Sequence, residues 1–239
     1  MIVDVFKPCK FDGLSEETFE NFLKIIDSTG DTYVLPDEFI CCGQSAYLQG
    51  FHELAKRTAL KLLNTYSVNR PLITPSTSCA GFILNNYGAM FFNTAFHNEY
   101  KQLTKNIFDI SQYLVNLKKI ETTRARFNHK VYYYSSCSSR NKQNVLDAPL
   151  VLLENVKGID LKYETKIEHQ CCGNGGLFSF NYPELSDKIT HSLVEDLSSL
   201  DVEYITSTDA SCLKKLQESI DLQKLNIKTI HFIDILAQF

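Results

Sequence analysis

The tripeptide Cys-Cys-Gly occurs twice in this chain, at residues 41–43 and again at residues 171–173. Each copy lies in the middle of a similar cysteine frame. The intervals before and after the cysteine pair are 31 and 36 residues in the first frame, and 33 and 39 residues in the second. The spacing therefore indicates a duplicated module that holds all eight cysteines. The first frame comprises Cys9, Cys41, Cys42 and Cys79, and the second comprises Cys137, Cys171, Cys172 and Cys212.

Four thiolates are the ligand number of a tetrahedral zinc site and of a cubane iron-sulfur cluster. Structural zinc sites usually take two cysteines from one short knuckle, and neither frame contains such a pair. The side chains of adjacent cysteines diverge, so they reach two irons of a cluster more easily than one zinc ion. The pattern thus favours an iron-sulfur cluster of the 4Fe-4S type in each half, with zinc in one site as the alternative. Glycines at 173, 175 and 176 could bring backbone N–H groups close to such a cluster.

Other catalytic and nucleotide-binding motifs are missing from the sequence. The chain has no Gly-x-Gly-x-x-Gly, no P-loop and no Gly-x-Ser-x-Gly. His169 lies two residues before Cys171, and we expect it to sit beside the site rather than ligate metal. We therefore expect no catalytic residue, and only the cysteines as binding residues.

Composition narrows the class of protein. The formal net charge is −4 and the basic residues are scattered, which argues against nucleic acid as a partner. No run of 18 apolar residues exists, so we expect no transmembrane segment. The stretch from Met1 to Phe6 is too short for a signal peptide and contains Asp4, so we expect a cytoplasmic protein. In a reducing cytoplasm, cysteines are expected to be ligands or redox groups rather than structural disulfides.

Strand and helix signals alternate along both halves of the chain, which predicts parallel sheets with helices on their faces. Each cysteine element directly follows a predicted strand, so both frames should gather at the carboxyl ends of their strands. Strands are predicted at 2–6, 32–35, 72–74, 131–134, 159–163, 204–206 and 229–232. Helices are predicted at 16–29, from the first Cys-Cys-Gly turn to 64, at 99–117, 148–155 and 183–200, after Cys212, and at the C-terminus.

The matched spacing predicts an α/β fold built from two pseudo-symmetric αβα halves. Each half should contain a small, mostly parallel sheet with its cysteine site at the carboxyl ends of the strands. Residues 1–117 are predicted to form the first module with a trailing helix. Residues 118–128 form a polar linker, and residues 129–239 form the second module.

The cysteine segments resemble those of the cysteine-rich CCG-domain family, and in particular members that are iron-sulfur subunits of bacterial L-lactate oxidation. The resemblance runs from Cys9 to the C-terminus. It is carried by Cys-Cys-Gly-Gln-Ser-Ala-Tyr-Leu-Gln-Gly at 41–50, Pro-Ser-Thr-Ser-Cys-Ala-Gly at 75–81, Ser-Cys at 136–137, Cys-Cys-Gly-Asn-Gly-Gly-Leu-Phe-Ser at 171–179 and Asp-Ala-Ser-Cys at 209–212.

The resemblance implies an electron-transfer subunit of an oxidoreductase complex rather than a stand-alone enzyme. Its implied partners are a second iron-sulfur protein and a third subunit, and each cysteine frame would be one ligand set. In the full family motif the last element is Cys-x-x-Cys, whereas here Ser76 and Asp209 replace the first cysteine of that element. The departure favours a four-cysteine cubane cluster over the non-cubane double cluster of the heterodisulfide reductase type.

Two other functions remain open on the residues alone. The adjacent cysteines could carry out thiol-disulfide chemistry of the heterodisulfide type, which would require an exposed thiolate of low pKa. Alternatively, zinc could stabilise an interaction module without redox function.

Overall fold

A computed structural model describes the chain except for residues 10–12, 141–146, 164–166, 168–169 and 176. Its centre is a pair of four-stranded sheets in which every pairing is parallel, with strand orders β2-β1-β3-β4 and β6-β5-β7-β8. Strands β1 to β4 correspond to β5 to β8, so the order is the same in both halves. The two pseudo-symmetric αβα halves predicted from the cysteine spacing are therefore confirmed. The strands are β1 (Ile2–Val5), β2 (Thr32–Val34), β3 (Leu72–Thr74), β4 (Ile107–Asp109), β5 (Lys130–Tyr133), β6 (Asp160–Lys162), β7 (Tyr204–Ser207) and β8 (Lys228–His231).

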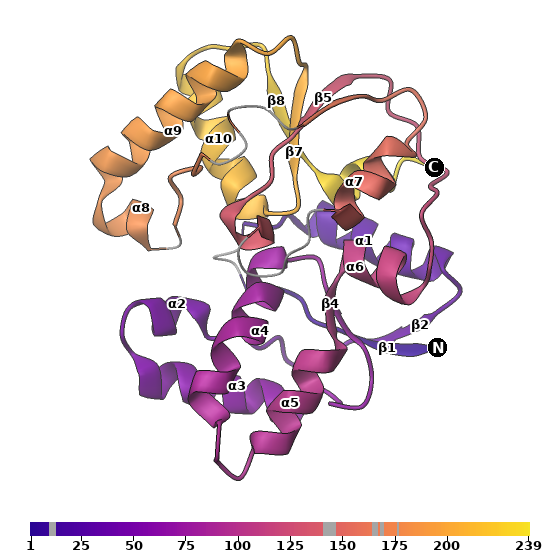
Figure 1. The fold of residues 1–239 in the computed structure, drawn as a ribbon, viewed down its shortest axis with the longest axis vertical. Helices are drawn as coiled ribbons and strands as arrows, with labels where there is room; N and C mark the ends of the chain where they lie inside the picture. The colour runs from indigo at the N-terminus through magenta and orange to yellow at the C-terminus, as the bar shows by residue number, and fades with distance from the viewer. Residues whose placement is uncertain (10–12, 141–146, 164–166, 168–169, 176) are drawn as a thin grey trace.

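The helices fall into an outer group on each half and a middle group between the halves (Figure 1). In the first half they are α1 (Glu16–Ser28), α2 (Gln44–Leu48), α3 (His52–Thr65), α4 (Thr77–Phe91), α5 (His97–Asn106), α6 (Ile110–Gln112) and the π-helix η2 (Tyr113–Leu117). In the second half they are α7 (Asp147–Glu154), α8 (Phe178–Asn181), α9 (Pro183–Ser198), α10 (Ala210–Leu222) and α11 (Phe232–Leu236).

The middle helices give the two halves one common hydrophobic core. Helix α1 of the first half corresponds to α7 of the second, and α6 corresponds to α11. Helix α1 packs on α11, and α6 packs on α7, so the two contacts between the halves are equivalent. Phe22 of α1 and Phe232 of α11 are both fully buried in this cluster. The side chain of Asp234 in α11 accepts hydrogen bonds from Thr18 Oγ1 at 2.8 Å and Asn21 Nδ2 at 2.9 Å, both in α1. The halves are therefore joined by packed apolar surface with polar contacts at its edge.

Local sequence explains where α1 begins and which face it buries. The Ser15 side chain accepts a hydrogen bond from the backbone N–H of Thr18 at 3.0 Å, and two glutamates follow in the first turn. Both features stabilise the positive N-terminal end of a helix. Phe19, Phe22 and Ile26 recur at helical spacing and are all buried, which places the predicted apolar stripe against the common core.

Two predicted helices are wrong in detail. The segment 99–117 is not one helix, because its middle forms strand β4, which pairs in parallel with β3. The apolar spacing there also fits a buried edge strand, and Asp109 then caps the short α6 by accepting from the N–H groups of Ser111 and Gln112. The helix predicted up to residue 64 is divided into α2 and α3 around Gly50, which has a positive φ of 83°.

The segment 118–128 joins the halves, and part of it is buried. Ala125 and Phe127 belong to the common core, and the backbone N–H of Arg126 donates to the carbonyl of Gln238 at 2.9 Å. The division into modules at 1–117 and 129–239 remains a prediction. Among the described residues, no helix is both long and apolar enough to cross a membrane.

Candidate functional site

Each element of the first cysteine frame follows a strand of the first sheet. Cys9 comes after β1, the Cys41-Cys42 pair comes after β2, and Cys79 lies in the first turn of α4 after β3. The sulfur atoms meet in two pairs, with Cys41 Sγ 3.8 Å from Cys9 Sγ and Cys42 Sγ 3.6 Å from Cys79 Sγ. The carboxyl ends of adjacent parallel strands thus bring together cysteines that are far apart in the sequence.

The two adjacent cysteines, Cys41 and Cys42, have pKa values shifted in opposite directions. Hydrogen bonds that Cys41 shares with the Cys42 and Cys9 thiols, together with one from the Gly43 N–H, lower the pKa of Cys41 to about 3. Contact with Cys41 and Cys79, together with burial, raises the pKa of Cys42. Cys41 is therefore a thiolate at neutral pH, which is the form that binds metal and attacks disulfides.

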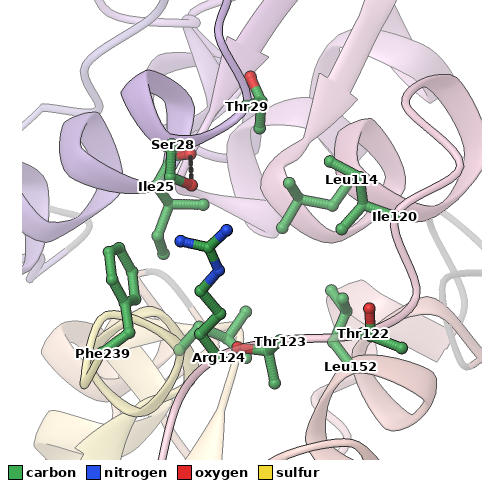
Figure 2. A pocket seen from close by; sticks show the side chains of 11 residues that line it. Ile25, Ser28, Thr29, Leu114, Ile120, Thr122, Thr123, Arg124, Leu152 and Phe239 are labelled. Atoms are coloured by element: carbon green, nitrogen blue, oxygen red, sulfur yellow. Dashed lines mark hydrogen bonds between the residues drawn. The ribbon is translucent and has the colours of Figure 1, made fainter.

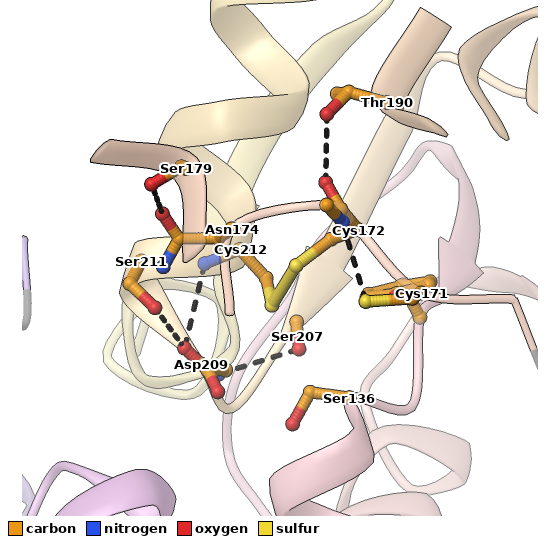
Figure 3. The surroundings of a disulfide bond; sticks show 12 residues. Ser136, Cys171, Cys172, Asn174, Ser179, Thr190, Ser207, Asp209, Ser211 and Cys212 are labelled. Carbon is orange, nitrogen blue, oxygen red and sulfur yellow. Dashed lines mark hydrogen bonds between the residues drawn. A yellow bond between two sulfur atoms is a disulfide. The ribbon is translucent and has the colours of Figure 1, made fainter. Parts of the chain in front are cut away.

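The second frame repeats this placement on the second sheet, and Figure 3 shows Cys171, Cys172 and Cys212 of this frame. Cys137 follows β5, the Cys171-Cys172 pair follows β6, and Cys212 lies in the first turn of α10 after β7. We expected thiols here, but Cys172 and Cys212 are joined in a disulfide with a Cα–Cα distance of 5.7 Å. This pair is the counterpart of Cys42 and Cys79, which are free cysteines in contact.

The glycine after each cysteine pair forms a turn that only glycine adopts readily. Gly43 and Gly173 have positive φ values of 92° and 80°. In both turns the glycine N–H donates to the sulfur of the first cysteine of the pair at 3.4 Å, Cys41 in one and Cys171 in the other. Of the glycines predicted to bring N–H groups close to a cluster, Gly173 directs its N–H at the Cys171 sulfur, and Gly176 lies outside the described residues. The equivalent contact of Gly43 was not predicted from the sequence.

The residues that replace the missing motif cysteines are helix caps. Ser76 Oγ accepts from the N–H of Cys79 at 3.1 Å at the start of α4. Asp209 Oδ1 accepts from the N–H of Cys212 at 3.4 Å at the start of α10. Each cap fixes the turn that holds the last cysteine of its frame, and a helix N-terminus favours a thiolate. Serine or aspartate three residues before a cysteine, directly after a strand, is a signal that would have predicted these caps.

Side chains from the outer helices hold the backbone of each cysteine pair. The hydroxyl of Tyr87 in α4 donates to the carbonyl of Cys42 at 3.0 Å. In the second half, Thr190 Oγ1 in α9 donates to the carbonyl of Cys172 at 2.8 Å, and Ser186 Oγ donates to the carbonyl of Gly173 at 2.9 Å. These buried residues were not predicted from the sequence, because they lie far from the cysteines in sequence and belong to no motif.

Both frames open on one cavity of about 670 Å³. Helices α2 and α8 lie on facing sides of this region in Figure 1, and both contribute residues to the cavity wall, among them Leu48 of α2 and Phe180 of α8. Cys171 is exposed and lies at the wall of a different hollow, beside Lys188. The cysteines lining the common cavity are Cys9, Cys41, Cys42, Cys79, Cys137, Cys172 and Cys212.

The atoms at this cavity that could bind a metal cluster are the sulfur atoms of the cysteines. Within the part of the chain that is described, no group of three or more His, Cys, Asp or Glu side chains is arranged to hold a single metal ion. His169 lies outside the described residues. Cysteine thiols, capped helix N-termini and glycine N–H groups beside an open cavity fit a thiolate-bound iron-sulfur cluster. The paired sulfur atoms would have to turn from one another toward the cavity to bind one.

Comparison with known proteins gives the same duplication. The family described as Cysteine-rich domain (CCG) matches residues 3–83 and 131–217, one match in each half. Each matched segment begins in the first strand of its half, β1 or β5, and extends beyond the last cysteine of its frame.

Curated relatives match over nearly their whole length. Lactate utilization protein A of Geobacillus kaustophilus is 29% identical over 99% of this chain and 98% of that protein. Lactate utilization protein A 2 of Bacillus cereus is 25% identical over 100% of this chain and 98% of that protein. Among solved structures, glutamate racemase isoform RacE1 from Bacillus anthracis covers 98% of this chain and 78% of its own, at 10% identity and a TM-score of 0.38. Similarity this low carries no information about function.

Proposed function

This chain belongs to the cysteine-rich CCG-domain family, and on that premise we propose that it is an iron-sulfur electron-transfer subunit of an L-lactate oxidation system. The observation that carries the proposal is that Cys9, Cys41, Cys42 and Cys79 of the first frame line one cavity together with Cys137, Cys172 and Cys212 of the second. Repeated sets of thiols at the carboxyl ends of two parallel sheets suit two redox centres placed close together.

In this proposal each cysteine frame holds one 4Fe-4S cluster. Cys41 has the thiolate form that ligation requires, and Cys79 and Cys212 are held in the first turns of the capped helices α4 and α10. The glycine N–H groups that point at Cys41 and Cys171 would stabilise charge on those sulfur atoms. A bound cluster would supply one-electron transfer. The protein's own contribution is to hold the cysteines in place and to surround the buried ones with apolar side chains. The buried cysteines are Cys42, Cys79, Cys172 and Cys212.

The relatives support lactate as the substrate of the whole system. Both carry the name lactate utilization protein A, and this chain matches them from end to end. The partners in this proposal are a second iron-sulfur protein and a third subunit, all in the cytoplasm. We assign lactate chemistry to those partners and electron transfer to this chain.

A second candidate function rests on the disulfide between Cys172 and Cys212. Reduction of that bond would take two electrons and two protons from a dithiol partner and leave two thiols in the cavity. The corresponding Cys42 and Cys79 are already in sulfur contact, so the first half could cycle in the same way. The chain would then be a thiol-disulfide redox protein without a cluster.

Anaerobic purification followed by iron, acid-labile sulfide, zinc and thiol analysis separates these functions. Iron with matching sulfide supports the electron-transfer subunit. Absence of iron, with a reversible change of two thiols per half on mild reduction, supports thiol-disulfide chemistry. Zinc without sulfide would contradict both. Reconstitution with the two partner proteins and lactate-linked dye reduction then tests the lactate assignment on its own.

A further inference from the structure

Large apolar side chains are exposed on two sides of the cysteine cavity. Leu48 of α2 and Phe180 of α8 line this cavity and yet are 53% and 81% exposed, so they lie at its opening to solvent. Phe51 and Tyr182 occupy the N-cap positions of the next helices, α3 and α9, and are exposed as well. The arrangement after the first Cys-Cys-Gly turn is thus repeated after the second. We call Leu48, Phe51, Phe180 and Tyr182 the apolar rim.

The two segments that carry the apolar rim contain no formal charge. No Asp, Glu, Lys or Arg occurs at residues 39–52 or at residues 169–183, although these four types make up 22% of the chain. Surfaces that only face water usually mix charged side chains of both signs. The centre of a protein interface, by contrast, has few charged residues and is enriched in aromatic ones. An exposed apolar surface of this kind therefore indicates a site that another protein covers.

The smaller cavity between the halves lacks this combination. Its volume is about 180 Å³ and none of the cysteines lines it (Figure 2). Among its described wall residues, Phe239 is the only large apolar side chain that is exposed. Of these two cavities, only the larger one brings exposed apolar residues together with the cysteines.

The charges that line the cysteine cavity do not favour a partner of either sign. All of them belong to α10 or to its cap, and two are acidic and two are basic. Lys215 is paired with Asp187 of α9, which lies outside the cavity wall. A partner that docks here needs no net charge on its contact surface. The charged wall residues are Asp209, Lys214, Lys215 and Glu218.

The size of the apolar rim indicates which kind of partner covers it. The exposed parts of Phe51, Phe180 and Tyr182 amount to roughly 300–500 Å², because one aromatic side chain contributes about 150–250 Å². Transient electron-transfer complexes bury less than about 1,200 Å² in total, shared between the two partners. Obligate dimers bury about 2,000 Å² or more. The apolar rim thus has the size of a transient redox contact and is too small for a permanent dimer of this chain.

We propose that the apolar rim is the docking surface for a redox-partner protein that presents an uncharged, apolar surface beside its own redox centre. The partner would cover the opening of the cavity and exclude water from the cysteine site while electrons pass. A second copy of this chain fits less well, because two cavities that face each other would leave neither open to another redox protein. This inference rests on the proposed electron-transfer function.

The test measures binding of the second iron-sulfur protein of the proposed system to the full chain by calorimetry without oxygen. Phe180→Ala should weaken binding about tenfold or more, because aromatic residues at an interface centre contribute most of the binding free energy. Phe92→Ala is the matched control, since Phe92 is 62% exposed and does not line the cavity. A rise in salt from about 0.05 to 0.5 M should change the affinity less than about threefold, because the contact contains no ion pairs.

Leu48→Asp tests the facing side of the cavity, where a charge placed inside an apolar contact should abolish binding. The docking proposal is overturned if the partner does not bind the unsubstituted chain, or if Phe180→Ala binds as tightly as Phe92→Ala. It is also overturned if sedimentation shows that the unsubstituted chain self-associates through Phe180.

Iron and acid-labile sulfide are measured in the same samples, which keeps the two proposals apart. An unsubstituted chain without iron and sulfide contradicts the electron-transfer function, whatever its binding. Full iron content together with unchanged binding in Phe180→Ala contradicts the docking surface alone.

Discussion

Asp209 Oδ1 accepts a hydrogen bond from the backbone N–H of Cys212 at 3.4 Å. The equivalent position in the first half is Ser76, which caps the helix of Cys79 with a hydroxyl group. The two cysteine sites therefore share this capping geometry, but the cap is a buried carboxyl group in the second site and a hydroxyl group in the first. Asp209 is only 4% exposed and also accepts from Ser211 Oγ at 2.7 Å, so this group is held in place beside the second site.

If both frames hold clusters, the carboxylate should lower the reduction potential of the second relative to the first, since net charge near a cluster sets its potential. Asp209→Asn keeps a capping oxygen and should shift the second potential toward positive values. Ser76→Asn, the matched control, changes no charge and should leave the first potential in place. Redox titration followed by electron paramagnetic resonance measures both. An unshifted second potential in Asp209→Asn would contradict this explanation.

Gly173→Ala should disrupt the second cysteine turn. An added Cβ would lie 2.6 Å from both the Ser186 carbonyl oxygen and Thr190 Oγ1, and φ is 80°. Gly30→Ala is the matched control, because Gly30 has a similar φ of 76° with nothing within 4 Å of the added atom. The control should lower the free energy of unfolding by only about 1–2 kcal/mol, the cost of a left-handed backbone conformation for alanine. Gly173→Ala should lower it by more, because the added Cβ also clashes. Urea unfolding compares the two, and equal losses would rule out the steric account.

His231 should make stability depend on pH below neutrality. Burial lowers its pKa to about 4, against about 6.5 in the unfolded chain. Between pH 6.5 and 4, His231 is therefore protonated in the unfolded state but not in the folded state. The free energy of unfolding should fall as the pH drops from about 6.5 to 4. The slope from one proton is at most about 1.4 kcal/mol per pH unit.

His231→Asn tests this dependence while retaining an acceptor for the Ile233 N–H, which His231 Nδ1 now caps at 3.3 Å. The variant should lose the slope between pH 6.5 and 4, as measured by chemical denaturation at a series of pH values. A slope that is the same in both proteins would mean that other groups produce it.

The two halves should unfold together, because their middle helices share one core. Phe232→Ala removes a fully buried ring from this cluster and should cost about 3–5 kcal/mol. Amide exchange should then quicken in both β1 and β5, although Phe232 belongs only to the second half. Faster exchange confined to the second sheet would show that the halves fold independently.

Much of the fold was predictable because short apolar strands and cysteine elements alternate at matched intervals. Strand β4 was not, since Leu103, Ile107, Ile110 and Leu114 also fit the spacing of a helix. Pairing with β3 makes residues 107–109 a strand rather than part of a helix, and the local sequence pattern does not indicate that pairing. Likewise, the cysteine spacing predicts which residues gather, whereas the strand order determines that Cys42 meets Cys79 and that Cys172 meets Cys212.

The most direct test of the electron-transfer account is the iron and acid-labile sulfide content of protein prepared without oxygen. Two 4Fe-4S clusters predict about eight irons and eight sulfides per chain. Cys171→Ser should halve both values while circular dichroism remains unchanged, because the strands and helices are stabilised by apolar packing rather than by this exposed cysteine. An unsubstituted chain without iron and sulfide, or one that keeps its full content in Cys171→Ser, would contradict the account.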